Sequence, residues 1–344
     1  MVRAVALLGI VVLNYYGFLV RAGAPLATGP VGGLLDPFLG PLATPPAATF
    51  VLVAGVGAAL MTRSLAGPEL RRSRVVLLRR GALLFVTGWL VDLAWPGTIL
   101  PYFGGLFLAA AVLVALTSRR VLVVGAVAAA AASALAWWQV EQRSSGRSVD
   151  WLSDPPHWTP QGLVLDTVVN GPHPLLPWLA FFCVGLVLGR VLGEPAWRPR
   201  ALGLGLVLLG AGALVAQLGS SGPLSVQVLT SAAPLSRSLV YTACTLGAAL
   251  LAFAGISWLA ERAPRSFPVD VLCRAGTMSL TIYLAHIVVF RVLVDGLGVV
   301  PLTGLVPALV LAMTFWVVAV LGAWWWHRRF GIGPAEAAYR WIGG

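Results

Sequence analysis

Apolar segments about as long as a bilayer is thick recur along the whole chain, and they constrain its fold more than any other feature. A helix needs about 20 residues to cross roughly 30 Å of hydrocarbon. With 59% hydrophobic and 10% charged residues, the chain has too little polar surface to enclose a soluble core. We therefore predict an all-α, polytopic integral membrane protein in which residues 1–344 form a single transmembrane domain of about ten helices. The predicted spans are residues 4–20, 46–63, 80–95, 99–117, 121–138, 174–192, 201–218, 238–260, 276–294 and 302–326.

The basic residues predict the orientation of these helices. All 23 are arginine, and placing the N-terminus inside puts 18 of them on the cytoplasmic side. Cytoplasmic loops of membrane proteins carry such an excess, so we expect both termini, including a tail at residues 327–344, in the cytoplasm. The net charge of +11 is spread beside apolar runs rather than gathered in a basic domain, which favours membrane lipids over nucleic acid as partners. The five arginines left elsewhere are Arg21, Arg143, Arg147, Arg237 and Arg291.

Motifs for metals and nucleotide cofactors are not evident. Cys183, Cys244 and Cys273 lie in or beside apolar segments without the spacing of metal ligands, so we assign no disulfide framework and no metal site. The glycine-rich stretches "GPVGG" and "GVG" lack the strand context of a phosphate-binding loop or a dinucleotide fingerprint.

The stretch "SLTIYLAHIVVF" (279–290) carries His286 into the middle of a predicted span. His286 and Asn14 each lie eleven residues, or about 16 Å, from the predicted cytoplasmic entry of their helices, so the two side chains should lie at one level. His286 also shares a helix face with Ser279 and Tyr283, and such a face must look into protein or water. A lone histidine could serve packing alone through an interhelical hydrogen bond. With Asn14 opposite, His286 could move a proton while the amide orients the ring or a reacting carbonyl.

Further polar residues lie at predicted exterior helix ends. Asp92 ends the span 80–95, Tyr102 begins the span 99–117, and His173 precedes the span 174–192. Such positions are commonly solvated or part of the interfacial belt, and a binding surface is the alternative. Arg291 and Asp295, at i and i+4, should pair with each other.

The stretch "RRSRVVLLRR" concentrates five arginines on the predicted cytoplasmic side. Positive-inside anchoring and anionic lipid account for such a cluster. The alternative is a clamp for the phosphates of a cytoplasmic donor such as coenzyme A, because guanidinium groups match phosphate geometry. The arginines are Arg71, Arg72, Arg74, Arg79 and Arg80.

Five stretches in order resemble a known family. They are "RAVALLGIVVLNYYG", "ILPYFGGLFLAAAVL", "GPHPLLPWLAFFCVGLVLGR", "AGTMSLTIYLAHIVVF" and "FGIGPAEAAYRW". They are similar to the first, fourth, sixth and ninth helices and the C-terminal tail of the transmembrane acyltransferase group that includes heparan-alpha-glucosaminide N-acetyltransferase and uncharacterised bacterial inner-membrane relatives.

The resemblance implies transfer of an acyl group, usually acetyl, from cytoplasmic acetyl-CoA or another acyl-CoA to an extracytoplasmic sugar or lipid-linked acceptor. It places the protein in the bacterial cytoplasmic membrane and makes His286 and Asn14 the catalytic candidates. A glycan or glycolipid would be the partner, and the sequence does not decide whether the protein is a homodimer. The candidates for acceptor binding are His173, Asp92, Tyr102 and Tyr283, and the five clustered arginines would bind the donor.

The chain departs from the family in two places. The lysosomal member carries a histidine in the loop after its first helix, and "YYGFLVRAGAPLATGPVGGLLD" contains none. Either His286 or His173 then takes the role of base, or the activity has changed or been lost. A transporter or lipid flippase that uses the same midplane polar residues, and a non-catalytic scaffold, stay open as alternatives. The acidic residue that usually precedes this arginine in the family is missing before Arg3, so the natural chain is expected to start upstream.

Overall fold

The computed structural model describes residues 1–156 and 158–344, and this part of the chain is helical throughout, without β-strands. Two π-helical segments, η1 (Asp166–Asn170) and η3 (Arg291–Gly296), and one 3₁₀ turn, η2 (Pro234–Ser236), join the α-helices. The α-helices are α1 (Val2–Arg21), α2 (Gly29–Leu34), α3 (Pro45–Thr62), α4 (Gly67–Ala94), α5 (Leu100–Leu113), α6 (Ser118–Ser144), α7 (Asp150–Ser153), α8 (Pro160–Leu165), α9 (Leu175–Val191), α10 (Trp197–Gly219), α11 (Leu224–Thr230), α12 (Leu239–Arg262), α13 (Phe267–Thr277), α14 (Ser279–Phe290), α15 (Leu305–Phe330) and α16 (Pro334–Gly343).

Among the described residues, seven helices are long and apolar enough to cross a bilayer: α1, α3, α6, α10, α12, α14 with η3, and α15. The segment from α8 to α9 adds an eighth if its two parts, bent by 55°, form one span. The chain is therefore a multi-pass membrane protein. The remaining two predicted spans correspond to α4 and α5. Helix α5 has only 14 residues, and α4 has 28 but begins with the arginine cluster, so the total of ten stays a prediction.

At two places the helices begin or break within or outside the limits of the predicted spans. The span expected at 276–294 is broken at Met278, whose φ of −112° and ψ of 28° end α13 and precede α14. Residues 71–80, expected to connect two spans, belong to the first half of the continuous helix α4. The helical periodicity of α4 therefore sets the directions in which the side chains of the arginine cluster point.

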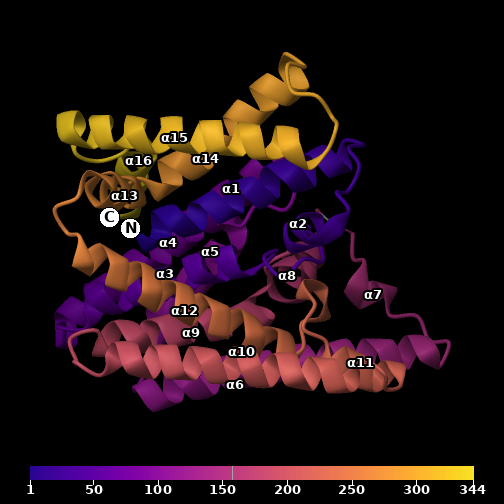
Figure 1. The fold of residues 1–344 in the computed structure, drawn as a ribbon. Helices are drawn as coiled ribbons and strands as arrows, with labels where there is room; N and C mark the ends of the chain where they lie inside the picture. Colours follow the sequence, from indigo (N-terminus) through magenta and orange to yellow (C-terminus); the bar gives the residue numbers. More distant parts are fainter. Residues whose placement is uncertain (157) are drawn as a thin grey trace. The chain divides into compact units, whose positions relative to one another are not determined.

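Contacts between Cα atoms divide the chain into two compact units. Unit 1 contains residues 1–50 and 251–341, and unit 2 contains residues 51–250 and 342–344. In unit 1, α1 packs against α13, α14 and α15, and α15 also contacts α13 and α14 (Figure 1). Near the end of the broken helix, Arg291 and Asp295 form the predicted ion pair within η3.

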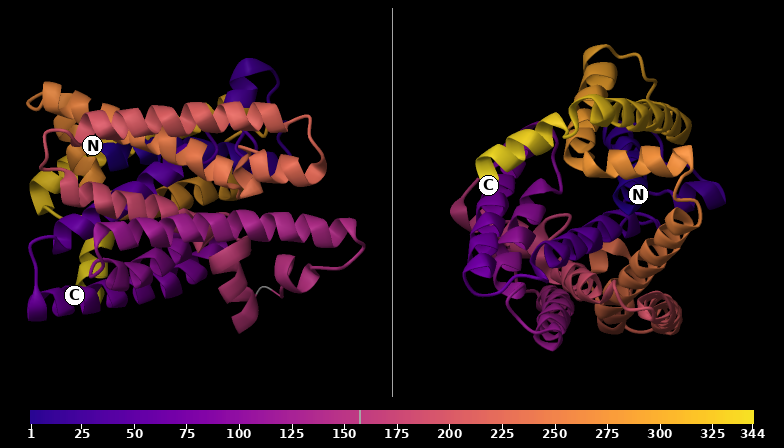
Figure 2. Two further views of the ribbon diagram at one scale, coloured as in Figure 1. Left: turned by 90° about the horizontal axis from the view of Figure 1, so that it is seen from below. Right: turned by 90° about the vertical axis from the view of Figure 1, so that its left-hand side faces the viewer.

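Unit 2 is built on long helix pairs. Helix α4 packs along α5, and the 27-residue α6 packs along α9 and contacts α11 (Figure 2). The backbones of α3 and α9 approach closely, because a Cβ atom built on Gly185 would lie 2.0 Å from the carbonyl oxygen of Leu52. Small residues at helix crossings are what close packing in a membrane requires, since lipid tails give helices no hydrophobic reason to associate.

Candidate functional site

The structure brings Asn14 and His286 together in unit 1. Asn14 lies on α1, about 18 Å along the helix axis from Val2, and its Nδ2 atom is 3.2 Å from Nε2 of His286. His286 lies on α14, about 10 Å from the first residue of that helix, and its side chain is fully buried. The helix that carries His286 begins at Ser279 rather than near Ala275, so His286 lies seven residues into α14.

The contacts of the His286 ring define its tautomer. Nδ1 lies against the carbonyl oxygen of Tyr283, and a carbonyl can only accept, so Nδ1 carries the proton and donates. In a neutral ring, Nε2 then has the free lone pair and accepts from the Asn14 amide. Nε2 is thus the atom able to take a proton, and the Tyr283 carbonyl holds the ring so that Nε2 faces α1.

Aromatic side chains enclose the His286 ring. Tyr15 of α1 stacks at 5.9 Å between ring centroids, Tyr283 lies at 4.7 Å and Phe315 of α15 at 6.5 Å. The Tyr15 hydroxyl donates a hydrogen bond of 2.9 Å to the carbonyl oxygen of His286. Three helices therefore fix the imidazole in an apolar surrounding, which strengthens its few polar contacts.

Glu336, which the sequence did not single out, caps the broken helix. Its Oε1 accepts hydrogen bonds from the backbone N–H groups of Leu280 (2.7 Å) and Thr281 (3.1 Å), and its Oε2 accepts one from the Thr281 hydroxyl (2.5 Å). The first N–H groups of a helix lack partners within the helix, and a carboxylate there is favoured by the helix dipole. Glu336 on α16 thus compensates the break at Met278 and fixes the start of the helix that carries His286.

The Glu336→Gln variant should fold but be less stable and less active. Loss of the charge at the α14 N-terminus should cost about 0.5–2 kcal/mol of unfolding free energy, typical of a helix N-cap. Because α14 carries His286, the rate of any reaction that depends on this residue should fall about three- to tenfold. Thermal unfolding and steady-state kinetics measure the two effects. Glu194→Gln, which removes an exposed ion pair with Arg200, is the matched control and should change neither quantity.

Unit 2 holds a second polar cluster, formed by Tyr102 and His173. Their rings lie 5.7 Å apart, and His173 also contacts Trp178 edge-on at 4.7 Å. Nδ1 of His173 is buried and has no hydrogen-bond partner among the described residues. Tyr283, the fourth candidate for acceptor binding, lies in unit 1 beside His286.

Asp92 stabilises a turn through hydrogen bonds to the backbone. Its Oδ1 accepts hydrogen bonds from the backbone N–H groups of Gly97 (2.8 Å) and Thr98 (3.3 Å), which closes the turn between α4 and α5. Pro96 and Gly97 mark a turn in the sequence, but they do not show which side chain closes it.

The arginine cluster separates into two sets. The Arg74 Nε donates to the carbonyl of Ala111 (2.5 Å), and Arg80 donates to the carbonyl of Gly344 (2.8 Å), so these two tie α4 to neighbouring backbone. Arg71, Arg72 and Arg79 are exposed. Arg72 and Arg79, at i and i+7, share one exposed face of α4.

Outside the spans, one carboxylate of unit 1 has a perturbed pKa. The Trp324 indole donates to Asp270 (2.8 Å) and so does the Arg274 guanidinium (2.7 Å), and these bonds hold the pKa of the Asp270 carboxyl below its usual range. Asp270 therefore stays ionised and anchors α13 to α15. No group of three or more His, Cys, Asp or Glu side chains in residues 1–156 and 158–344 could hold a metal ion.

Comparison with known proteins assigns the chain to a family. The family model described as "Heparan-alpha-glucosaminide N-acetyltransferase, catalytic" matches residues 1–219, more than half of the 344 residues. The chain belongs to this family. The resemblance expected from the sequence is thus confirmed. A second model, "Protein of unknown function (DUF418)", matches residues 186–343, and no curated protein or solved structure matches the chain.

The two matches divide the candidate residues between them. The match to the heparan-alpha-glucosaminide N-acetyltransferase family includes Asn14, Tyr102, His173 and the arginines of α4. His286 and Glu336 fall within residues 186–343. The contact between Asn14 and His286 therefore joins the segments covered by both models.

Proposed function

We propose that this protein is a membrane-embedded acyltransferase that moves an acyl group, acetyl in the first instance, from cytoplasmic acyl-CoA to an extracytoplasmic sugar or lipid-linked acceptor. The observation that carries the proposal is the contact between half-buried Asn14 and buried His286 in a member of an acetyltransferase family. A transporter or flippase would be identified instead by substrate-dependent proton movement without an acylated product.

His286 is the proposed general base. Its Nε2 takes the proton from the acceptor hydroxyl or amine as the acceptor oxygen or nitrogen attacks the thioester carbonyl. The carbon–sulfur bond then breaks, and coenzyme A leaves as the thiolate, which takes the proton from the His286 imidazolium and so restores the neutral ring. Nε2 has the free lone pair for this step, since Nδ1 donates to the Tyr283 carbonyl.

Asn14 is the proposed partner of the base. In the resting contact its amide donates to Nε2 of His286 and keeps the ring in the productive tautomer. When the acceptor displaces the amide from Nε2, the same N–H group can donate to the carbonyl oxygen on which negative charge develops. A single short amide side chain could thus serve in both steps.

Arg71, Arg72 and Arg79 are the proposed donor-binding residues. All three are exposed on α4, whereas Arg74 and Arg80 already donate to backbone carbonyls. Phosphates of coenzyme A suit the planar fork of arginine. The residues assigned to acceptor binding are Tyr102, His173, Asp92 and Tyr283. Of these, Asp92 acts indirectly, through the turn that it closes.

The double variant Arg72→Gln, Arg79→Gln should raise the KM for acetyl-CoA about tenfold, because two charge-assisted contacts to phosphate are lost. Its kcat should stay within about twofold of the parent, since neither residue touches the reacting atoms. Steady-state kinetics with acetyl-CoA measure both. The double variant Arg119→Gln, Arg120→Gln removes the same charge from the exposed start of α6 and is the control. An equal rise in KM in both variants would mean that general surface charge, and not a site on α4, attracts the donor.

The membrane arrangement belongs to the proposal. We place the protein in the bacterial cytoplasmic membrane with ten spans and both termini inside, because this orientation gives the arginine excess to the cytoplasm. The direct test of function uses purified protein, acetyl-CoA labelled in the acetyl group, and a panel of amino sugars and sugars. Transfer of label to one of them supports the proposal. Hydrolysis of acetyl-CoA without transfer, or no reaction with any sugar or lipid-linked acceptor, would contradict it.

A further inference from the structure

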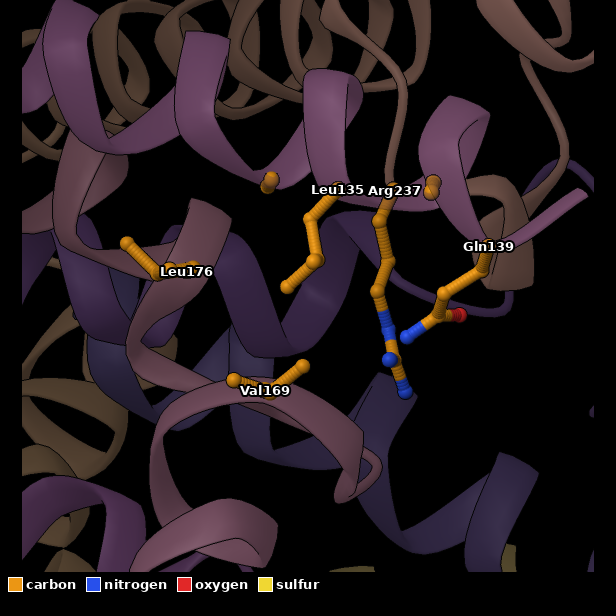
Figure 3. A pocket seen from close by; sticks show the side chains of 7 residues that line it. Leu135, Gln139, Val169, Leu176 and Arg237 are labelled. Atoms are coloured by element: carbon orange, nitrogen blue, oxygen red, sulfur yellow. The ribbon is translucent and has the colours of Figure 1, made fainter. Parts of the chain in front are cut away.

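A small cavity in unit 2 contains one guanidinium and one amide group among apolar side chains. Its volume is about 240 Å³, including the open space at its mouth. The apolar walls are Leu135, Val169 and Leu176, and the polar groups are Gln139 of α6 and Arg237 from the segment before α12 (Figure 3). The side chains of Arg237 and Gln139 extend side by side into this space in Figure 3.

The backbone at Arg237 is held in an unusual conformation. Its φ of 53° and ψ of 22° lie in the left-handed region, and no other non-glycine residue of the described chain has a positive φ. Such a conformation costs about 1–3 kcal/mol in a non-glycine residue and is concentrated at functional sites. The guanidinium is in turn fixed by donation to the carbonyl oxygens of Asn170 and Gly171. The surrounding structure thus fixes both the backbone conformation of Arg237 and the position of its guanidinium group.

Arg237 is a half-buried cation. No ion pair to it is formed by the residues that the structure describes, and only carbonyl oxygens accept from its NH2 group. Burial lowers the pKa of the Arg237 guanidinium from its ordinary value, while Tyr241, Tyr102 and Asp166 oppose this shift at longer range. A charge removed from water in this way is costly unless an anion compensates it. Gln139 likewise makes no hydrogen bond within the described residues, so its amide is also available.

We propose that Arg237 and Gln139 form a binding site for an oxyanion, the carboxylate or phosphate group of the extracytoplasmic acceptor. The Nε and Nη1 hydrogens of the guanidinium, which are not used for the bonds to Asn170 and Gly171, can donate to such a group, and the Gln139 amide donates a further bond. The space inside the cavity that a water-sized group can occupy is only about 20 Å³, far below the roughly 300 Å³ or more of a pocket for a whole ligand, so the cavity suits one small anionic group on a larger molecule. Leu135, Val169 and Leu176 exclude water and strengthen the charge–charge attraction.

The cavity adjoins the acceptor candidates of unit 2. Arg237 donates to the Gly171 carbonyl (3.2 Å), and a Cβ atom on Gly171 would lie 2.0 Å from the hydroxyl oxygen of Tyr102. Tyr102 in turn contacts His173. The assignment of the anion to the acceptor rests on the proposed function, whereas the oxyanion site itself rests on the geometry of Arg237.

Binding measurements test the site without relying on activity. Calorimetric titration of the full-length protein in phosphatidylcholine nanodiscs would compare glucose 1-phosphate and glucuronate with neutral glucose. We expect the two anions to bind at least about tenfold more tightly than glucose, and Arg237→Gln to remove this difference. Arg237→Lys should retain part of it. Arg147→Gln, an exposed arginine on another loop, removes the same charge and should change nothing. Equal binding of glucose and the anions, or full anion binding in Arg237→Gln, would overturn the site.

Two further experiments identify the molecule that supplies the anionic group. Nanodiscs that contain phosphatidylglycerol should leave binding of glucose 1-phosphate unchanged; competition by this lipid would assign the site to a lipid headgroup and overturn the link to the acceptor. Acyl transfer to anionic and neutral sugars is then compared in the parent protein. If no sugar is acylated while the anions still bind through Arg237, the proposed function fails and the oxyanion site stands.

Discussion

The His286→Ala variant should lose acyl transfer from acetyl-CoA by about 10²- to 10⁴-fold, the range that a general base contributes. Nε2 is the ring atom with a free lone pair, and Ala removes the only group at this position that can accept the acceptor's proton. The loss should appear in kcat, with a KM for acetyl-CoA within about twofold of the parent. Transfer of labelled acetyl groups under saturating donor measures it.

A second substitution separates chemistry from packing. Ala leaves a cavity at a fully buried position and destabilises the helix packing, whereas Gln nearly fills the space and keeps hydrogen-bonding groups. His286→Gln should therefore unfold at nearly the parental temperature and still be inactive, because an amide cannot move a proton near neutral pH. His327→Ala, a half-buried histidine at the end of α15, is the matched control and should remain active. Full activity in His286→Gln would refute the base assignment.

The Asn14→Leu variant should reduce kcat by about 10²-fold, as loss of a donor to a developing oxyanion does. Leu has nearly the shape of Asn but cannot donate to Nε2 of His286 or to the thioester oxygen. The KM for acetyl-CoA should not change, because the arginines of α4 are assigned to the donor. Single-turnover rates at saturating acetyl-CoA give the cleanest measure, since they exclude product release.

Tyr15→Phe provides the comparison for Asn14. It removes the hydroxyl that donates to the His286 carbonyl but leaves Nε2 untouched. The expected cost is about 1 kcal/mol of stability and a change of no more than about threefold in kcat. If Tyr15→Phe lowered the rate as much as Asn14→Leu, the Asn14 amide would be one more packing contact and not a catalytic group.

The polar pair of unit 1 could be predicted because it depends on simple geometry. Asn14 and His286 lie in apolar stretches that predict spanning helices, and helical rise alone suggested that they meet. The break at Met278 could not be predicted in the same way, since the apolar pattern continues through "AGTMSLTIYLAH" without Pro, and a single glycine, Gly276, is tolerated within a helix. Its compensation by Glu336 is a contact over 55 residues of chain, which no local pattern reveals.

The sites of unit 2 were harder to predict from the sequence. The arginine cluster was found, but only the helix α4 shows which of its members are exposed and which donate to backbone carbonyls. Arg237 had one signal, its place among the five arginines outside the cytoplasmic excess. That signal did not reveal its left-handed backbone or its cavity, because both depend on the packing of α6, η1 and α9 around it.

The most direct test of the account is the passage of an acetyl group across a sealed membrane. Proteoliposomes containing the parent protein or His286→Gln would receive labelled acetyl-CoA on one side and a sugar panel, including glucose 1-phosphate and amino sugars, on the other. The account predicts labelled acetyl-sugar in the compartment without acetyl-CoA for the parent protein and none for His286→Gln. Proton or sugar movement by the parent protein without any acetylated product would contradict it and identify a transporter.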